Sequence, residues 1–144
     1  MENITEFKNE NRWLSNMWSC RIQFDGHVYS SVEHAYVAAK TLDVGERHKI
    51  RYTIQPQTAK KYGRSLVLRD NWDTLKLVYM EQFLNQKFDP STKLGQKLLK
   101  TGDVLLVEGN HWNDTFWGVC RGKGDNHLGK LLMKIRDQNR PHLT

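Results

Sequence analysis

Long apolar runs and leader-like segments are missing from this chain of 144 residues. No hydrophobic stretch approaches the roughly 18–20 residues that a membrane-spanning helix needs. The first residues, Met-Glu-Asn-Ile-Thr-Glu, lack the basic and apolar regions of a secretory signal. We therefore expect a cytoplasmic protein that has no membrane partner.

Cysteines and metal-ligand patterns are also scarce. The two cysteines, Cys20 and Cys120, could pair only across a long sequence gap, and a reducing cytosol argues against a structural disulfide. Cys120 lies just past Trp117-Gly118, so a nucleophilic role is one interpretation, but a small buried thiol is the more frequent case. The histidines show no ligand spacing with the cysteines, so we expect no metal and no cofactor.

Positive charge outweighs negative charge, with 22 Lys and Arg against 16 Asp and Glu, which gives a net charge of +6 and a pI of about 9.4. Such a balance attracts phosphate groups, whether on free nucleotides or on nucleic acid. The basic residues are dispersed along the chain, so a merely solvated basic surface is the alternative. With 26% charged and 38% hydrophobic residues, we expect a single globular domain over residues 1–144, and no obligate protein partner is indicated.

The periodicity of the sequence predicts a helix-dominated α+β domain with a small antiparallel sheet. Residues 22–29 alternate apolar and polar around Asp25-Gly26, which is a strong hairpin signal. The apolar run at 104–107 is expected to form a buried strand. Helices are predicted from Ser30 to about Leu42, from Pro56 to Gly63, from Asn71 to Phe88, from Ser91 to Gly102, and after Asn126.

The first predicted helix carries a candidate catalytic face. Ser30 as N-cap and Glu33 three residues later fit a capping box. Glu33, Tyr36 and Lys40 follow one another at i, i+3 and i+7, so one face presents a carboxylate, a phenol and an ammonium. A carboxylate beside an ammonium can hold an attacking water, stabilise a cationic sugar or tune the pKa of the amine. A capping box needs no active site, so a structural role for Glu33 is the alternative.

The second candidate acid is Asp114, in the segment 108–118 that follows the apolar run. Trp112, Phe116 and Trp117 flank it, and aromatic faces beside a carboxylate can stack a planar base and place negative charge near its sugar. This combination indicates chemistry at a sugar–base bond. The alternatives are that Asp114 only closes an Asx-turn and that the tryptophans belong to the core.

A glycine-rich segment, residues 121–126, precedes the last predicted helix. Glycines at this place let backbone N–H groups approach an anion, and Lys123 adds positive charge. The spacing matches neither a Walker A motif nor a dinucleotide fingerprint. A flexible turn is therefore the alternative to a phosphate-binding loop.

Taken in order along the chain, these motifs resemble the NADAR family, the YbiA-like N-glycosidases, over nearly the whole length. The family's important acids and tryptophan correspond to Glu33, Trp72 and Asp114, whereas Asn113 departs from the glycine that relatives often have before the aspartate. The other matching residues are Leu14-Ser-Asn16, Asp25-Gly26, Ser31-Val-Glu-His-Ala-Tyr36, Lys40, Ala59, Gly63-Arg64, Arg69, Asn71, Met80, Lys87-Phe88, Leu106-Val-Glu108, Trp117-Gly118, Gly122-Lys-Gly124, Asn126, Leu128-Gly129, Leu132-Met133 and Ile135-Arg136.

The resemblance implies an enzyme that hydrolyses the N-glycosidic bond of a nucleotide-like substrate. The leading hypothesis is removal of ADP-ribose from guanine, either in a free nucleotide or in DNA or RNA. The second is hydrolysis of phosphorylated ribosylamino-pyrimidine intermediates of riboflavin synthesis. The third is a non-catalytic module that binds ADP-ribose or a nucleotide.

The expected site combines three catalytic side chains with a binding set. Asp114 or Glu33 stabilises the sugar cation and activates water, as in other glycoside hydrolysis. Lys40 offers a second route, in which its amine holds the opened sugar as a Schiff base. The substrate-binding residues are expected to be Asn16, Tyr36, Arg64, Trp72, Trp117, Gly118, Lys123 and Asn126, with Arg64, Lys123 and the glycine loop holding phosphate.

Overall fold

The computed structural model describes residues 1–141. Its internal contacts divide the chain into two compact units: unit 1 comprises Met1–Ser15 and Phe88–Thr144, and unit 2 comprises Asn16–Lys87. The single domain expected from the sequence stays a prediction. No helix among the described residues is long and apolar enough to cross a bilayer.

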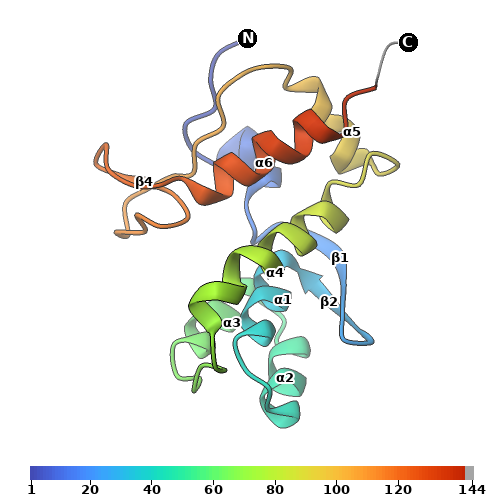
Figure 1. Ribbon diagram of the computed structural model, residues 1–144, viewed down its shortest axis with the longest axis vertical. Helices are drawn as coiled ribbons and strands as arrows, with labels where there is room; N and C mark the ends of the chain where they lie inside the picture. Colours follow the sequence, from blue (N-terminus) through green and yellow to red (C-terminus); the bar gives the residue numbers. More distant parts are fainter. Residues whose placement is uncertain (142–144) are drawn as a thin grey trace. The chain divides into compact units, whose positions relative to one another are not determined.

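Unit 2 is built on the predicted hairpin. Strands β1 (Ser19–Phe24) and β2 (His27–Ser31) pair antiparallel, and Asp25 and Gly26 turn between them with φ angles of 47° and 79°. Both angles lie in the left-handed region that a two-residue hairpin turn requires and that Asp-Gly tolerates. Helix α1 (Val32–Ala39) packs against the hairpin (Figure 1).

Three further helices of unit 2 contact α1: α2 (Val44–Arg51), α3 (Pro56–Gly63) and α4 (Trp72–Lys87). The bounds of α3 are those that the sequence predicts, and α4 begins and ends one residue inside the predicted range. All the residues of α1 are buried, since this helix lies among the other elements of the unit. It is therefore the element best placed to hold a polar side chain away from bulk water.

The predicted cap of α1 is wrong by one residue. Ser31, not Ser30, is the N-cap, and its hydroxyl accepts a hydrogen bond from the His34 N–H at 3.0 Å. His34 therefore occupies the position that a capping box assigns to Glu33. The helix also ends at Ala39 rather than near Leu42, because Asp43 caps α2, a helix that the sequence analysis missed.

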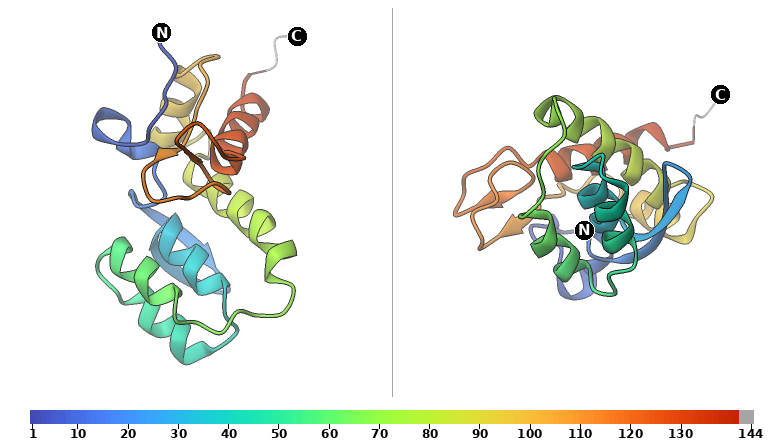
Figure 2. Two further views of the ribbon diagram at one scale, coloured as in Figure 1. Left: turned by 90° about the vertical axis from the view of Figure 1, so that its left-hand side faces the viewer. Right: turned by 90° about the horizontal axis from the view of Figure 1, so that it is seen from below.

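Unit 1 contains a 3-10 helix, η1 (Asn9–Leu14), and two α-helices that contact each other, α5 (Lys93–Lys100) and α6 (His127–Gln138), visible in the views of Figure 2. Thr92 rather than Ser91 caps α5, accepting from the Gly95 N–H at 3.0 Å. Two-residue strands β3 (Gly109–Asn110) and β4 (Val119–Cys120) pair in parallel, which the sequence analysis did not predict.

The strand predicted at residues 104–107 is wrong. This segment is an extended loop that makes one parallel bridge, between Leu106 and Ile4. The backbone of Ile4 bonds to the Leu105 carbonyl at 2.9 Å and to the Val107 N–H at 2.8 Å. Side chains supply the other partners: the Leu105 N–H donates to Asn3 Oδ1 at 2.9 Å, and the Leu106 carbonyl accepts from Asn126 Nδ2 at 3.0 Å. The apolar pattern correctly indicated burial of Val104 and Leu106 but not the kind of pairing.

Lys87, at the end of α4, is buried, with 2% of its surface exposed. Burial lowers the pKa of its amine to about 7, and the Cys20 thiol acts in the opposite direction. The unfolded chain keeps the ordinary lysine pKa of about 10.4, so it binds more protons than the folded chain between these values. Burying the charged Lys87 amine therefore lowers the free energy of unfolding. This loss of stability is complete below pH 7, shrinks as pH rises, and vanishes above about pH 10.5.

We therefore expect Lys87→Met to raise the free energy of unfolding, by on the order of a few kcal/mol below pH 7 and by progressively less toward pH 10. Urea denaturation at pH 6, 7.5 and 9 measures this gain. Lys93→Met, at an exposed position in α5, is the control and should change stability little at any of these pH values. Equal gains for Lys87→Met at pH 6 and pH 9 would contradict a buried, readily deprotonated amine.

Candidate functional site

Unit 2 gathers six of the residues predicted for the site: Asn16, Glu33, Tyr36, Lys40, Arg64 and Trp72. On α1, Glu33 is 8% exposed and Tyr36 is buried, while Lys40 at the C-cap is half-buried. The Lys40 Nζ lies 5.3 Å from the centroid of the Tyr36 ring. The centroid of the Trp72 ring also lies 5.3 Å from the centroid of the Tyr36 ring. The predicted spacing on α1 thus brings a carboxylate, a phenol and an amine to one buried face.

The corrected cap changes the interpretation of Glu33. Because Ser31 caps the helix with the His34 N–H, Glu33 is not the capping-box residue that offered a purely structural explanation. Its backbone N–H donates to the Asn16 carbonyl at 3.0 Å, which ties Asn16 to the start of α1. A buried carboxylate is costly unless it has partners that favour its charge.

Asn16 holds an unsatisfied polar atom beside this helix start. Its Nδ2 contacts the Met80 sulfur at 3.6 Å, but its Oδ1 is buried and has no hydrogen-bond partner among the described residues. Buried side-chain oxygens in native proteins are nearly always paired. An Oδ1 without a partner at this position can accept a hydrogen bond from a bound ligand.

The amine of Lys40 is electrostatically unusual. Burial lowers its pKa, the Glu33 carboxylate raises it, and the cations Lys60, Arg64 and Lys76 lower it further, so the balance lies below the ordinary lysine value. Spacing alone could not rank the opposing effects of burial and of Glu33; in the folded protein burial is the larger of the two, and the pKa is lowered. Such a lysine is a better nucleophile near neutral pH.

Trp72 is part of the packing of unit 2. Its side chain is 6% exposed, and its ring lies 6.3 Å from that of Tyr79 in a stacked arrangement, besides its contact with Tyr36. Little of its face is open for a base. The structure therefore favours the core interpretation for Trp72 over direct stacking on substrate.

Trp72→Ala should destabilise the protein by about 3–5 kcal/mol, because it removes a large buried ring. Trp117→Ala is the matched comparison: Trp117 is half-exposed, and we expect a smaller stability loss and, if it stacks on a base, a binding loss of about 1–3 kcal/mol. Chemical denaturation and ligand affinity are measured on the same preparations. A Trp72→Ala variant of wild-type stability would contradict the core assignment.

The second candidate acid, Asp114, lies in the β3–β4 connection of unit 1. Its Oδ1 accepts from the backbone N–H groups of Phe116 at 3.2 Å and of Trp117 at 2.9 Å, so Asp114 does close an Asx-turn. Its Oδ2 has no hydrogen-bond partner among the described residues. One oxygen is therefore structural, and the other is available for a ligand.

Asn110, at the end of β3, holds the backbone of Asp114 in place. Its Nδ2 donates to the Asp114 carbonyl at 2.8 Å, and its Oδ1 accepts from the Asp114 N–H at 3.1 Å. The same Nδ2 reaches Glu108 Oε2 at 3.1 Å. Asn110 carries no local sequence signal for this role, because only the fold shows which backbone its amide binds.

The aromatic residues around Asp114 differ in exposure. Trp112 is 57% exposed, whereas Phe116 and Trp117 are half-exposed and meet edge to face at 4.8 Å between ring centroids. His127 lies 4.4 Å from Phe116. Gly118 serves packing, since a Cβ at this position would collide with Glu108 and Asn110. Trp117 is thus the aromatic side chain among the predicted binding residues of unit 1, and part of its surface is open.

The glycine loop does not present the backbone cradle that its composition suggests. The N–H groups of residues 125–128, where α6 begins, already donate to the carbonyls of residues 115–118. Asn126 occupies the N-cap position of α6, as expected, but its φ is 54° and its side chain makes no capping hydrogen bond; it binds Leu106 and Glu108 instead. Lys123, exposed in this loop, can still attract an anion with its ammonium.

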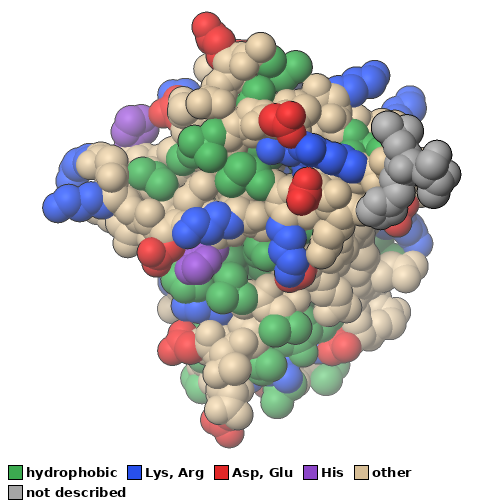
Figure 3. Space-filling view, turned by 45° about the horizontal axis from the view of Figure 1, so that its top comes forward, with side chains coloured by type: hydrophobic (Ala, Val, Ile, Leu, Met, Phe, Trp, Pro, Cys, Tyr) green, Lys and Arg blue, Asp and Glu red, His purple; other side chains and the backbone are tan. Residues whose placement is uncertain are grey.

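Other features give no competing site. No group of three or more His, Cys, Asp and Glu that could hold a metal occurs among residues 1–141. Cys120 is buried and Cys20 half-buried, both as free thiols. On the face drawn in Figure 3, blue basic side chains are scattered and interrupted by red acidic ones. The basic side chains on this face are therefore dispersed and form no continuous track there.

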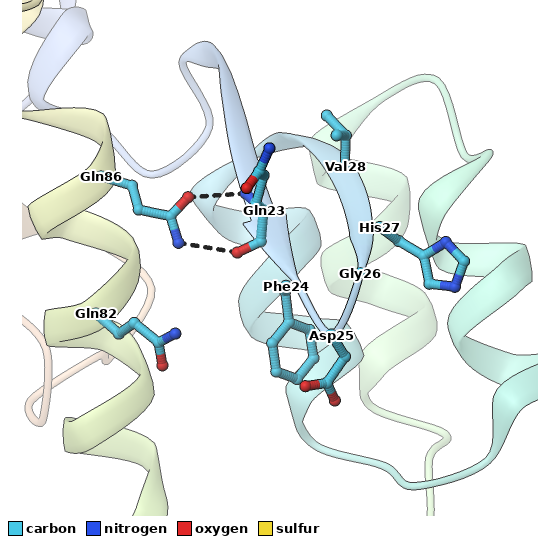
Figure 4. A pocket seen from close by; sticks show the side chains of 8 residues that line it. All are labelled: Gln23, Phe24, Asp25, Gly26, His27, Val28, Gln82 and Gln86. Atoms are coloured by element: carbon cyan, nitrogen blue, oxygen red, sulfur yellow. Dashed lines mark hydrogen bonds between the residues drawn. The ribbon is translucent and has the colours of Figure 1, made fainter.

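A cavity of about 530 Å³ lies between the hairpin and α4 in unit 2 (Figure 4). The side chain of Gln86 binds the backbone N–H and carbonyl of Gln23, both at 2.8 Å, and so covers the outer edge of β1. None of the predicted site residues lines this cavity. The residues that do are Gln23, Phe24, Asp25, Gly26, His27, Val28, Gln82 and Gln86.

Comparison with known proteins gives consistent matches along the chain. The family model described as the NADAR domain matches residues 4–140. N-glycosidase YbiA of Escherichia coli (strain K12) is 39% identical over 128 residues, covering 87% of this chain and 79% of that protein. An N-glycosidase of Nostoc punctiforme is 37% identical over 137 residues, covering 91% and 87% of the two chains.

A riboflavin biosynthesis protein of Vibrio vulnificus is 33% identical over 133 residues, which cover 90% of this chain and 36% of that protein. The NMR structure of the E. coli protein YbiA superimposes with a TM-score of 0.83 at 34% sequence identity, covering 99% of this chain and 92% of that chain. The predicted helix-dominated α+β fold with a small antiparallel sheet is thereby confirmed.

Proposed function

Because the chain belongs to the NADAR domain family, we propose that it is an N-glycosidase that hydrolyses the bond between a base and the sugar of a nucleotide-like substrate. Relatives that match most of its length carry the name N-glycosidase. The observation that carries the proposal is the α1 face, where the buried Glu33 carboxylate and the Lys40 amine of lowered pKa lie together. Both groups have the chemistry that N-glycoside cleavage requires.

In the direct route, the sugar–base bond breaks through a transition state with positive charge on the sugar ring. A carboxylate beside that ring stabilises the charge and takes a proton from the attacking water, while the base leaves with its bonding electrons and gains a proton. Glu33 is buried on α1 and Asp114 offers its Oδ2 in unit 1. Either carboxylate can perform this role.

In the covalent route, the neutral amine of Lys40 attacks the anomeric carbon and the base departs with the electrons of the broken bond. The ring oxygen then takes a proton as the sugar opens, which leaves a Schiff base between the sugar and Lys40. Water adds to this intermediate and releases the sugar, so the amine is regenerated. The lowered pKa of Lys40 supports this route because it increases the fraction of neutral amine.

For the substrate, we propose ADP-ribose linked to guanine, in a free nucleotide or in nucleic acid. The excess of basic residues supports a substrate with several phosphate charges. Asn16 Oδ1, a buried acceptor without a partner among the described residues, supports recognition of a donor on the ligand. A phosphorylated ribosylamino-pyrimidine is the second candidate, because one relative is named as a riboflavin biosynthesis protein.

The test is incubation with each substrate type, followed by mass analysis of the released fragments. Guanine ADP-ribosylated in an oligonucleotide, the same modification on free GMP, and a phosphorylated ribosylamino-pyrimidine are compared at equal concentration. Release of ADP-ribose from guanine is the expected result. Release of ribose phosphate from the pyrimidine alone would select the second substrate. Binding with no bond cleavage in any sample would instead indicate a non-catalytic binding module.

A further inference from the structure

We propose that His34 is a positioning residue for the reaction, because its imidazole ties the first turn of α1 to the segment that follows α2 and so fixes the direction of the Glu33 side chain. His34 directly follows Glu33 on α1 and is 1% exposed, so it acts through Glu33 rather than on the substrate itself. The inference rests on the proposed function, since His34 affects turnover only if Glu33 does.

The imidazole of His34 makes hydrogen bonds at both of its nitrogens. Its Nε2 lies 2.8 Å from the Thr53 carbonyl oxygen, and its Nδ1 lies 2.6 Å from the Ser31 Oγ and 3.4 Å from the Ser30 Oγ. A carbonyl oxygen only accepts, so Nε2 carries the proton and Nδ1 accepts from the Ser31 hydroxyl. The Ser31 Oγ in turn accepts from the His34 backbone N–H at 3.0 Å. The ring is therefore held as one tautomer of the neutral imidazole.

Thr53, the partner of the His34 Nε2, is itself bound to the last turn of α2. Its backbone N–H donates to the Ile50 carbonyl at 3.1 Å, and its hydroxyl donates to the Lys49 carbonyl at 2.7 Å. A continuous chain of hydrogen bonds thus runs from the end of α2 through Thr53 and His34 to Ser31, the N-cap of α1. The start of α1 is thereby connected to a second helix of the same unit.

The first turn of α1 needs this support. The first N–H groups of a helix have no partners within it, and a helix of eight residues is too short to be stable by itself. Glu33 lies in this turn, where its N–H donates to the Asn16 carbonyl at 3.0 Å. Fraying of the turn would change the direction of the Glu33 side chain relative to Tyr36 and Lys40, which lie farther along the same face. The bonds of the His34 ring oppose that movement.

The connection requires a neutral ring at position 34. Burial lowers the pKa of the His34 imidazole, and the bond to Thr53 acts in the opposite direction. A protonated ring would place a positive charge in the first turn of α1, where the helix dipole disfavours cations. Its Nδ1 could also no longer accept from the Ser31 hydroxyl. The position therefore needs a neutral side chain that can donate to Thr53, and glutamine meets this requirement.

The first experiment compares two amide substitutions of His34. The amide of glutamine reaches the place of Nε2 and can donate to Thr53, whereas the shorter asparagine reaches only the place of Nδ1. We expect His34→Asn to lower kcat by on the order of ten- to a hundredfold at nearly unchanged KM, since a misplaced Glu33 fails in the transition state. His34→Gln should restore most of kcat. His27→Asn, at an exposed position in β2, is the control and should keep wild-type turnover.

A double-mutant cycle tests the same role without turnover. Acetylation of Lys40 by acetic anhydride from pH 6 to 10, followed by peptide mass analysis, reports the pKa of that amine, with the exposed Lys130 as internal reference. Glu33 raises the Lys40 pKa. Glu33→Gln should therefore shift the profile to lower pH in the wild type and shift it less in His34→Asn, where Glu33 is already displaced.

The outcomes separate positioning from stability and from the proposed function. Wild-type kcat in folded His34→Asn, an equal loss in His34→Gln, or equal shifts in both backgrounds of the cycle would overturn the role, as would an NMR spectrum that finds the neutral ring protonated at Nδ1. If His34→Asn does not fold, Ser31→Ala removes the hydroxyl on the other side of the ring and replaces it in both measurements, with the same expected directions. An inactive protein with unequal shifts would reject the proposed function alone, and an active protein with equal shifts would reject the positioning role alone.

Discussion

Asp114→Asn should leave the fold nearly intact and reduce turnover by two or more orders of magnitude. Asparagine keeps the Oδ1 acceptor that closes the turn with the N–H groups of Phe116 and Trp117. It removes the negative charge that a developing sugar cation needs, and losing one electrostatic contact to a transition state costs about 10²–10³ in rate. The kcat on the cleaved substrate and the melting temperature are measured together.

Asp137→Asn is the control for this variant, because Asp137 lies in the same unit, is 77% exposed, and pairs only loosely with Arg140 at 3.6 Å. It should keep wild-type turnover. Wild-type turnover in Asp114→Asn itself would remove Asp114 from the mechanism and leave it as a turn residue. Loss of melting temperature together with loss of activity would assign the effect to the turn.

The parts of the fold that sequence predicted are those set by local chemistry. Asp25-Gly26 tolerates the positive φ angles of a tight hairpin, and Pro56 and Gly63 mark the two ends of α3. The residues that misled are those whose partners lie far along the chain. Asn126 looks like a helix cap, but its amide binds Leu106 and Glu108, about twenty residues earlier.

The candidate site divides in the same way. The spacing of Glu33, Tyr36 and Lys40 is a property of one helix, so it predicted a shared face that the structure contains. The cations Lys60 and Lys76 lower the Lys40 pKa from other helices, and no local pattern could assign that effect to them. The pKa of Lys40 likewise depends on burial. Only the packing of α1 shows that burial lowers this pKa more than Glu33 raises it. For Asp114, the sequence predicted both the flanking aromatic residues and the Asx-turn, because both depend on neighbours in the chain.

Borohydride added during turnover should trap substrate sugar on Lys40, seen as a mass increase on the peptide that contains it, if the covalent route operates. Lys40→Ala should show no adduct and should lose activity by orders of magnitude. Lys61→Ala, an exposed lysine on α3, should trap as the wild type does. Absence of an adduct in wild-type protein whose activity is confirmed in the same tube would reject the covalent route and leave water attack.

The pH dependence of trapping follows from the direction of the Lys40 pKa. Only the neutral amine attacks, so the yield at short times should rise with pH through the lowered pKa and level off above it, at a lower pH than for an ordinary lysine. Glu33 raises that pKa, so Glu33→Gln should move the profile to lower pH, while the exposed Glu10→Gln should not move it. If Glu33 is also the carboxylate that the sugar cation needs, the same variant should lose the plateau as well as shift the curve. A shifted profile with an undiminished plateau would instead make Glu33 a positioning residue that tunes the pKa of Lys40.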